Sequence, residues 1–174
     1  MPKIVTLEPL GELLPDADIP EWLVSKPYPI RYFGGVALPV TFDCVEAGVP
    51  PDAGSAVHAF LNLDDSARLA ASSYVFKNYR DFADAIGDEN VGCEIRDPRE
   101  VWGFIKPTEI RISRRPRRDR AIYVQIVAEC QWEPEHGLQI VYRDGSQLSR
   151  VSDQDGHLTW TDASDLPESQ DRVA

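Results

Sequence analysis

The sequence has few cysteines and no long apolar run. Its three cysteines, Cys44, Cys93 and Cys130, are widely separated, and no pair has the Cys-x-x-Cys spacing of a zinc ribbon. An odd, scattered set also argues against a disulfide framework, so we expect reduced thiols that lie mostly in the interior. No run of 18 or more apolar residues is present. The sequence therefore predicts that no helix spans a membrane.

The common catalytic signatures are also missing. The sequence contains no P-loop and no Gly-x-Gly-x-x-Gly, Gly-x-Ser-x-Gly or His-Glu-x-x-His motif. The amino terminus has one lysine before it turns acidic, without the apolar core and small-residue cleavage site of a secretory signal. We therefore expect a cytoplasmic protein without a cofactor, and a non-catalytic role is favoured.

Positive charge is scarce outside one segment. The formal net charge is −11, yet residues 111–120 (RISRRPRRDR) carry +5, so the remainder carries −16. An acidic body repels nucleic acid and attracts basic partners. The arginine run also lacks the interleaved aromatic side chains that stack on bases. It is therefore predicted to be an exposed hairpin connection whose arginines pair with nearby carboxylates, and the expected partner is a basic protein.

The first quarter of the chain predicts a β-hairpin. Two β-rich runs within residues 28–45 flank Gly34-Gly35, a pair that suits a tight turn. Pro39 cannot donate a ladder hydrogen bond, which indicates a sheet edge or a bulge. Upstream, residues 4–7 are the clearest strand-like run, because prolines interrupt the segment that follows (Pro15, Pro20 and Pro27).

The middle of the chain predicts three helices, over residues 55–62, 64–86 and 98–105. Asp64 or Asp65 caps the second helix, and Gly87 is placed to end it. Its apolar residues recur at helical spacing and predict a buried stripe made of Leu69, Phe76, Tyr79, Ala83 and Ile86.

The last third predicts a four- or five-stranded antiparallel meander over residues 108–160. Its best strand alternates for twelve residues, with the inward face formed by Ile122, Val124, Ile126, Ala128, Cys130 and Trp132. Asp144-Gly145 and Asp155-Gly156 are turn signals. The polar, acidic tail 161–174 is expected to fray. The prediction is one α+β domain over residues 1–160, with an antiparallel sheet built from the N-terminal hairpin and the meander and about three helices packed on one face.

Residues 133–137 (EPEHG) concentrate polar side chains in a predicted turn. Backbone geometry accounts for Pro134 and Gly137. Successive turns of a meander alternate ends, so this turn should share an end of the sheet with residues 152–157. A partner-binding surface is therefore predicted from Glu133, Glu135, His136, Asp155 and His157.

Two alternatives remain for these turns. In the first, they form an enzymatic or metal-binding site from Glu135, His136, Asp153, Asp155 and His157, although a defined His or Cys pair is missing. In the second, the turns are purely structural, in an accessory protein. The remaining histidine, His58, is predicted to be a packed or solvated helix residue.

One further pattern connects these elements. Trp132-x-x-Glu135-His136-Gly137-Leu138, followed by the Asp144-Gly145 hairpin and VSDQDGHLTW, resembles the C-terminal signature of an uncharacterised bacterial domain family. Its members are encoded near polymorphic toxin systems and include candidate immunity proteins. The resemblance covers residues 28–160. It implies a small bacterial cytosolic α+β protein that neutralises another protein, such as a toxin, and it assigns no catalytic residue.

Overall fold

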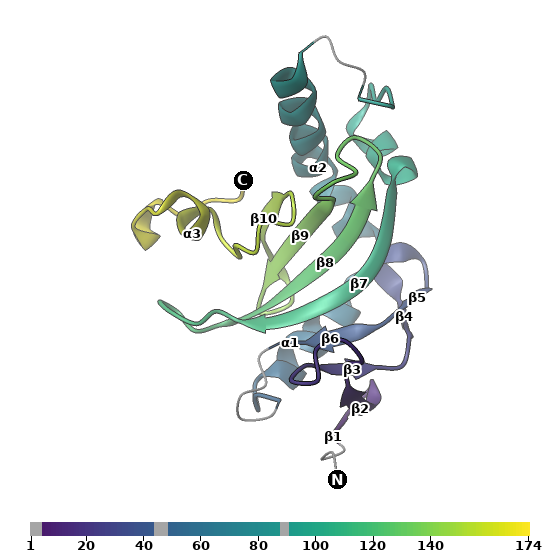
Figure 1. Cartoon of the computed structure of the whole chain (residues 1–174), viewed down its shortest axis with the longest axis vertical. Coiled ribbons are helices and arrows are strands. Elements are labelled where there is room, and N and C mark those ends of the chain that lie inside the picture. Colours follow the sequence, from purple (N-terminus) through teal and green to yellow (C-terminus); the bar gives the residue numbers. More distant parts are fainter. Residues whose placement is uncertain (1–4, 44–48, 88–90) are drawn as a thin grey trace.

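The computed structural model describes residues 5–43, 49–87 and 91–174. Its strands are β1 (Val5–Leu7), β2 (Gly11–Pro15), β3 (Leu23–Ser25), β4 (Tyr28–Ile30), β5 (Val36–Leu38), β6 (Val40–Phe42), β7 (Ile105–Arg114), β8 (Ile122–Cys130), β9 (Leu138–Arg143) and β10 (Gln147–Ser152). Eight of them form one sheet in the order β1-β2-β3-β6-β7-β8-β9-β10 (Figure 1). The α+β prediction is confirmed.

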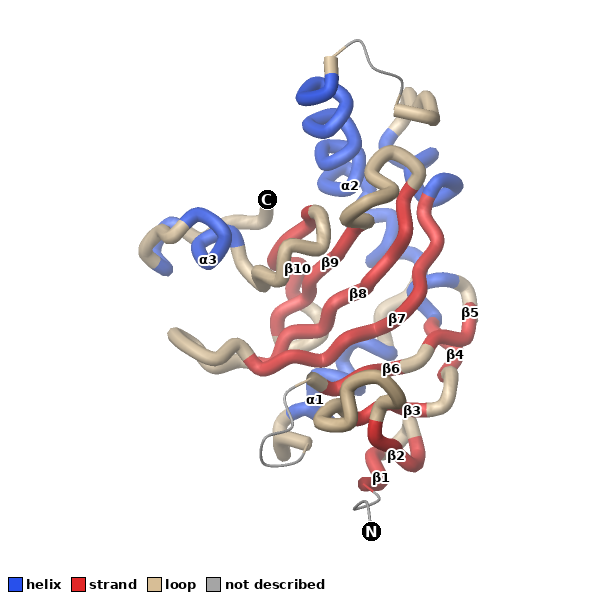
Figure 2. The backbone as a smooth tube through the Cα atoms, viewed as in Figure 1, coloured by secondary structure: helices blue, strands red, loops and turns tan. Residues whose placement is uncertain are grey.

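The predicted meander forms as β7 to β10, the long strands that run side by side in Figure 2. Every neighbouring pair in the sheet is antiparallel except β6 and β7, where Phe42 lies beside Ile112 in parallel register. A parallel pair needs a long crossover, and here the helical middle of the chain supplies it. A fifth meander strand after Asp155-Gly156 does not form, because the chain leaves the sheet there.

The predicted N-terminal hairpin forms as a small separate sheet. β4 and β5 pair with Ile30 beside Val36, and the connection includes a short 3-10 helix, η1 (Arg31–Phe33), before Gly34 and Gly35. Both glycines have positive φ, as their placement predicted. Pro39 stands where the chain passes from this small sheet into β6. The proline thus marks a change of sheet.

Helices cover one face of β7 to β10. They are α1 (Ala53–Leu61), α2 (Asp65–Ile86) and the 3-10 helix η2 (Pro98–Phe104). The Asp64 side chain caps α2, and Asp97 caps η2. The predicted inward face of β8 packs in this core, including Trp132, whose side chain is 1% exposed. Trp132 also donates from Nε1 to Oδ1 of Asn78 at 3.0 Å.

The stripe predicted for α2 is wrong at one end. Leu69 is 47% exposed, whereas the buried residues are Ala71, Ser72, Val75 and Tyr79. Leu69 lies outside the face that these buried residues form, and of the rest of the predicted stripe Tyr79 is buried while Phe76, Ala83 and Ile86 are half-buried. The far half of α2 extends past the end of the sheet (Figure 1), so its last residues have less surface to pack against. None of the helices in the described ranges is long and apolar enough to cross a membrane.

The C-terminal segment covers the opposite face of the sheet, which corrects the expectation of a fraying tail. It contains the short helix α3 (Trp160–Ser164) and the 3-10 helix η3 (Glu168–Gln170). Leu158 packs with Tyr123 and Val141 in a second apolar cluster, and Thr161 is fully buried. At the edge of the sheet, the backbone N–H of Val151 donates to the carbonyl of Ala174.

The cysteines follow the expected pattern only in part. Cys130 is buried, Cys93 is half-buried, and Cys44 lies outside the described residues. Burial raises the pKa of the Cys130 thiol to about 11, so this thiol is a packing group and not a reactive nucleophile.

Candidate functional site

Glu133 organises the turn between β8 and β9. Its carboxylate accepts from the backbone N–H groups of Glu135 and His136, at 3.1 and 3.2 Å, and its carbonyl accepts from the N–H of Gly137. Gly137 has φ +64°, and a Cβ there would lie 2.6 Å from the carbonyl oxygen of Ala128. Glu133 and Gly137 therefore fix the shape of the turn.

The other two predicted residues of this turn point outward. Glu135 is exposed, and the His136 side chain is 62% exposed. His136 Nδ1 lies 3.5 Å from Oε1 of Glu133. The structure thus holds one free carboxylate and one imidazole on a rigid hairpin tip, which agrees with the predicted placement.

The second predicted turn lies beside the first, as the alternation of hairpins indicated. Gln154 donates from Nε2 to the carbonyl of Ala128 at 3.1 Å, and its backbone N–H donates to the carbonyl of His136 at 3.4 Å. Both turns therefore stand at one end of the sheet, and Gln154 joins them.

Asp155, however, is occupied inside the protein. Arg150 donates to both of its oxygens, at 2.5 and 2.6 Å, and Gln139 and the N–H of His157 donate to Oδ1. Burial raises the pKa of Asp155, but the hydrogen bonds from Arg150 and from the His157 N–H, together with the charge of Arg150, outweigh it and the pKa is lowered. Asp155 is therefore an ionised structural anchor for the chain reversal after β10.

His157 lies beside the arginine-rich segment. Its Nδ1 lies 3.4 Å from Oδ2 of Asp155, and its exposed ring lines a hollow formed with the 115–118 segment. Within residues 5–43, 49–87 and 91–174, no group of three or more His, Cys, Asp or Glu side chains is arranged to hold a metal ion. The alternative metal site therefore gains no geometric support.

An apolar hollow of about 440 Å³ adjoins the first turn. It is lined by Gly103, Phe104, Ile105, Lys106, Glu129, Cys130, Gln131 and Pro134. Lys106 and Glu129 form a cross-strand ion pair at its rim, 3.2 Å between Nζ and Oε2. We call this hollow, together with Glu135 and His136, the turn surface. The turn surface thus combines an apolar recess with the exposed side chains of Glu135 and His136.

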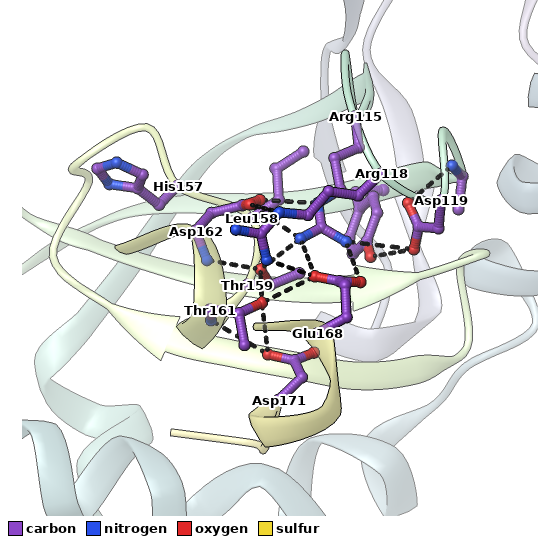
Figure 3. Close-up of polar contacts among 12 residues, drawn as sticks. Arg115, Arg118, Asp119, His157, Leu158, Thr159, Thr161, Asp162, Glu168 and Asp171 are labelled. Atoms are coloured by element: carbon purple, nitrogen blue, oxygen red, sulfur yellow. Dashed lines mark hydrogen bonds and ion pairs between the residues drawn. The ribbon is translucent and has the colours of Figure 1, made fainter. Parts of the chain in front are cut away.

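The arginine-rich segment holds a network that the sequence did not reveal. It connects β7 to β8 as predicted, but Arg115 is 2% exposed and not a solvated tip residue. Its guanidinium binds Asp162 through Nε and Nη2, both at 2.8 Å, and Glu168 through Nη1 and Nη2, at 3.0 and 2.7 Å (Figure 3). The expected pairing of arginines with carboxylates is thus confirmed at Arg115.

The network lowers the pKa of both carboxyl groups. Burial raises the pKa of Asp162, but the hydrogen bonds and charge of Arg115, with smaller contributions from Thr159 and Arg118, together outweigh it and the pKa is lowered. Hydrogen bonds from Arg115 and Arg118 lower the pKa of Glu168 to about 2. Both carboxylates are ionised at neutral pH. They attach the C-terminal segment to the β7–β8 connection, which is a structural role.

The described residues thus form an α+β fold with two braced turns. A family model described as a domain of unknown function, DUF6985, matches residues 9–158. The match covers most of the chain, and the protein belongs to this family. No curated protein and no solved structure matches the chain.

Proposed function

We propose that this protein is a non-catalytic, bacterial, cytoplasmic binding domain that neutralises a basic protein, such as a toxin, through the turn surface. One observation carries the proposal. Within the described residues, the side chains of Glu135 and His136 form no hydrogen bond that shapes the turn, and the one close approach is that of His136 to Glu133. Glu133, Gly137 and Gln154 hold the turn in place. A pre-organised tip loses little conformational entropy when a partner binds.

Charge supports a basic partner. The net charge is −11, and the one strongly basic segment uses Arg115 and Arg118 on internal carboxylates. Carboxylates across an interface steer basic partners and increase the rate of association. The apolar hollow beside Pro134 would receive an apolar anchor residue of the partner. Asp155 was predicted to contact the partner. In this proposal, its role is only to hold His157 in place.

The proposal is tested by co-expression with a basic toxin encoded beside the gene of this protein. The wild-type protein and Glu12→Lys, a reversal at an exposed carboxylate on β2, are expected to restore growth. Glu135→Lys is expected to fail and to weaken binding at least about tenfold, because a like charge then faces the partner. Rescue by Glu135→Lys equal to that by Glu12→Lys would exclude the turn surface as the binding site.

A further inference from the structure

The sheet face opposite α1 and α2 carries a chain of hydrogen bonds that ends in a carboxylate. Gln125 donates from Nε2 to Oγ of Ser113 at 2.7 Å, and the Ser113 hydroxyl donates to Oδ2 of Asp43 at 2.7 Å. Gln125 and Ser113 are 5% and 7% exposed. A hydroxyl has one proton to donate, so this chain has a fixed direction. Its terminal group, Asp43, is an acceptor held in place.

These residues line a hollow of about 290 Å³ on the sheet. Asp43 follows β6, Ser113 lies on β7 and Gln125 on β8, so three adjacent strands position the polar groups. Arg111, Arg114 and Leu158 also line the hollow. The site therefore stands on the most regular part of the fold and not on a turn.

The two arginines of the hollow already have partners. Arg111 donates from Nε to Oε1 of Glu109 at 3.1 Å, and its guanidinium stacks over the ring of Trp22. Arg114 forms an ion pair with Asp52 and donates to the carbonyl of Arg120. Both positive charges are thus balanced within the protein.

The charge of Asp43 is not balanced in this way. In the described part of the chain, no Lys, Arg or His forms an ion pair with Asp43, and the Ser113 hydroxyl is its side-chain donor. Burial raises the pKa of Asp43, and Ser113 and Arg111 oppose that rise only in part. A half-buried carboxylate without a cation is costly unless a ligand supplies the missing charge.

We propose that this hollow binds a cationic hydrogen-bond donor, a guanidinium or primary ammonium group, on the Asp43 carboxylate. Gln125 uses its amide N–H on Ser113, so its side-chain oxygen remains as a second acceptor. Leu158 offers apolar contact to the stem of such a group. The site lies on the sheet face and does not depend on the turn surface.

The experiment uses agmatine, an end-blocked Gly-Arg-Gly peptide and the matching citrulline peptide as probes. Nuclear magnetic resonance follows the Gln125 side-chain amide and the Ser113 backbone amide during each titration, up to about 10 mM, a range that detects millimolar binding. Both cationic probes are expected to shift these signals saturably, and the neutral citrulline peptide is not. Binding of agmatine alone would identify a free amine as the ligand, and binding of the peptide alone would identify a basic side chain.

The matched variants are Asp43→Asn, which keeps the shape and removes the charge, and Asp18→Asn at an exposed loop carboxylate. Asp43→Asn should weaken binding at least about tenfold, which is the loss expected for a charge-assisted hydrogen bond. Asp18→Asn should leave binding unchanged. The proposal is overturned if the wild-type signals show no saturable shift with either cation, if the citrulline peptide binds equally well, or if Asp43→Asn binds like the wild-type protein.

Discussion

On one face of β8, Val124 and Ile126 pack against helices, as does Trp132 just beyond the strand; on the other face, Tyr123 packs with Leu158 of the C-terminal segment. The first face is covered by a large apolar core. The second is covered through a small apolar cluster around Leu158 and the ion pairs of Arg115. Apolar burial does not depend on protonation, whereas ion pairs do. One sheet therefore carries two covers that should respond differently to mutation and to pH.

The largest effect is expected on the helical face. Trp132→Ala removes a fully buried ring and leaves Asn78 without its indole donor. Truncations of this kind cost about 3–5 kcal/mol of unfolding free energy. Chemical denaturation measures the loss, with Trp160→Ala on the other cover as the control, which should cost less. An unfolding midpoint equal to that of the parent would show that Trp132 does not support the core.

A smaller loss is expected when the ion pairs of the other face are removed. Arg115→Met removes the buried cation of Asp162 and Glu168, and we expect a loss of about 2–3 kcal/mol, because Arg118 and some contact with water remain for both carboxylates. Arg117→Met, at the exposed neighbour, should stay within about 0.5 kcal/mol. Hydrogen exchange should show faster exchange of residues 160–170 in Arg115→Met, and equal exchange in both variants would contradict the attachment role.

Acidic pH is expected to weaken the attachment of the C-terminal segment to the sheet. The pKa of Asp162 and of Glu168 is lower in the folded protein than the usual 3.8 and 4.5. Their stabilisation is therefore complete above those usual values and is lost as the pH falls through the folded values, about 2 for Glu168. Limited proteolysis of the C-terminal segment across this acidic range tests the point. Arg115→Met should reduce the pH dependence, because only Arg118 then lowers the pKa of the two carboxyl groups as a cation, while burial of Trp132 should not change over the same range.

The smallest effect is expected at the turn surface. The double variant Glu135→Ala/His136→Ala should change the unfolding free energy by no more than about 0.5 kcal/mol, since both side chains are exposed. Gly137→Ala, one residue further on, should destabilise the protein clearly, because its positive φ and the Ala128 carbonyl leave no room for a Cβ. Similar thermal denaturation of the two proteins would show that the turn is not rigid.

The sequence predicted elements whose periodicity is strong. The alternation in β8 marked its inward face, although the strand is buried on both faces except at Glu129, and the predicted cap Asp64 marks the start of its helix correctly. It did not predict β2 and β3, because short strands bounded by prolines carry little pattern. The parallel pairing of β6 with β7 depends on how the helices between these strands pack on the sheet. No local sequence pattern predicts that packing.

The structure of the C-terminal segment could not be predicted from local patterns either. The acidic composition of this segment predicted a loose tail, because composition does not reveal that Asp162 and Glu168 form ion pairs with a buried Arg115. A local signal did exist, since Thr159 and Asp162 have the spacing of a helix cap, and the Thr159 side chain accepts from the N–H of Asp162. Counting the hairpins was enough to predict that the two turns lie at the same end of the sheet. The ion pair between Arg150 and Asp155 could not be predicted, because the register of β10 shifts at a bulge between Leu148 and Arg150.

The parallel pair at the centre of the sheet has a consequence for biogenesis. β6 is joined to the long strands by contacts such as that of Asp43 with Ser113, which are 70 residues apart in the chain. A ribosome releases the amino-terminal strands well before β7 exists to receive them. Contacts this distant in sequence slow folding and prolong the exposure of unpaired strand edges. Maturation of this protein should therefore be completed only after synthesis of its carboxyl-terminal half, with β6 exposed to chaperones until then.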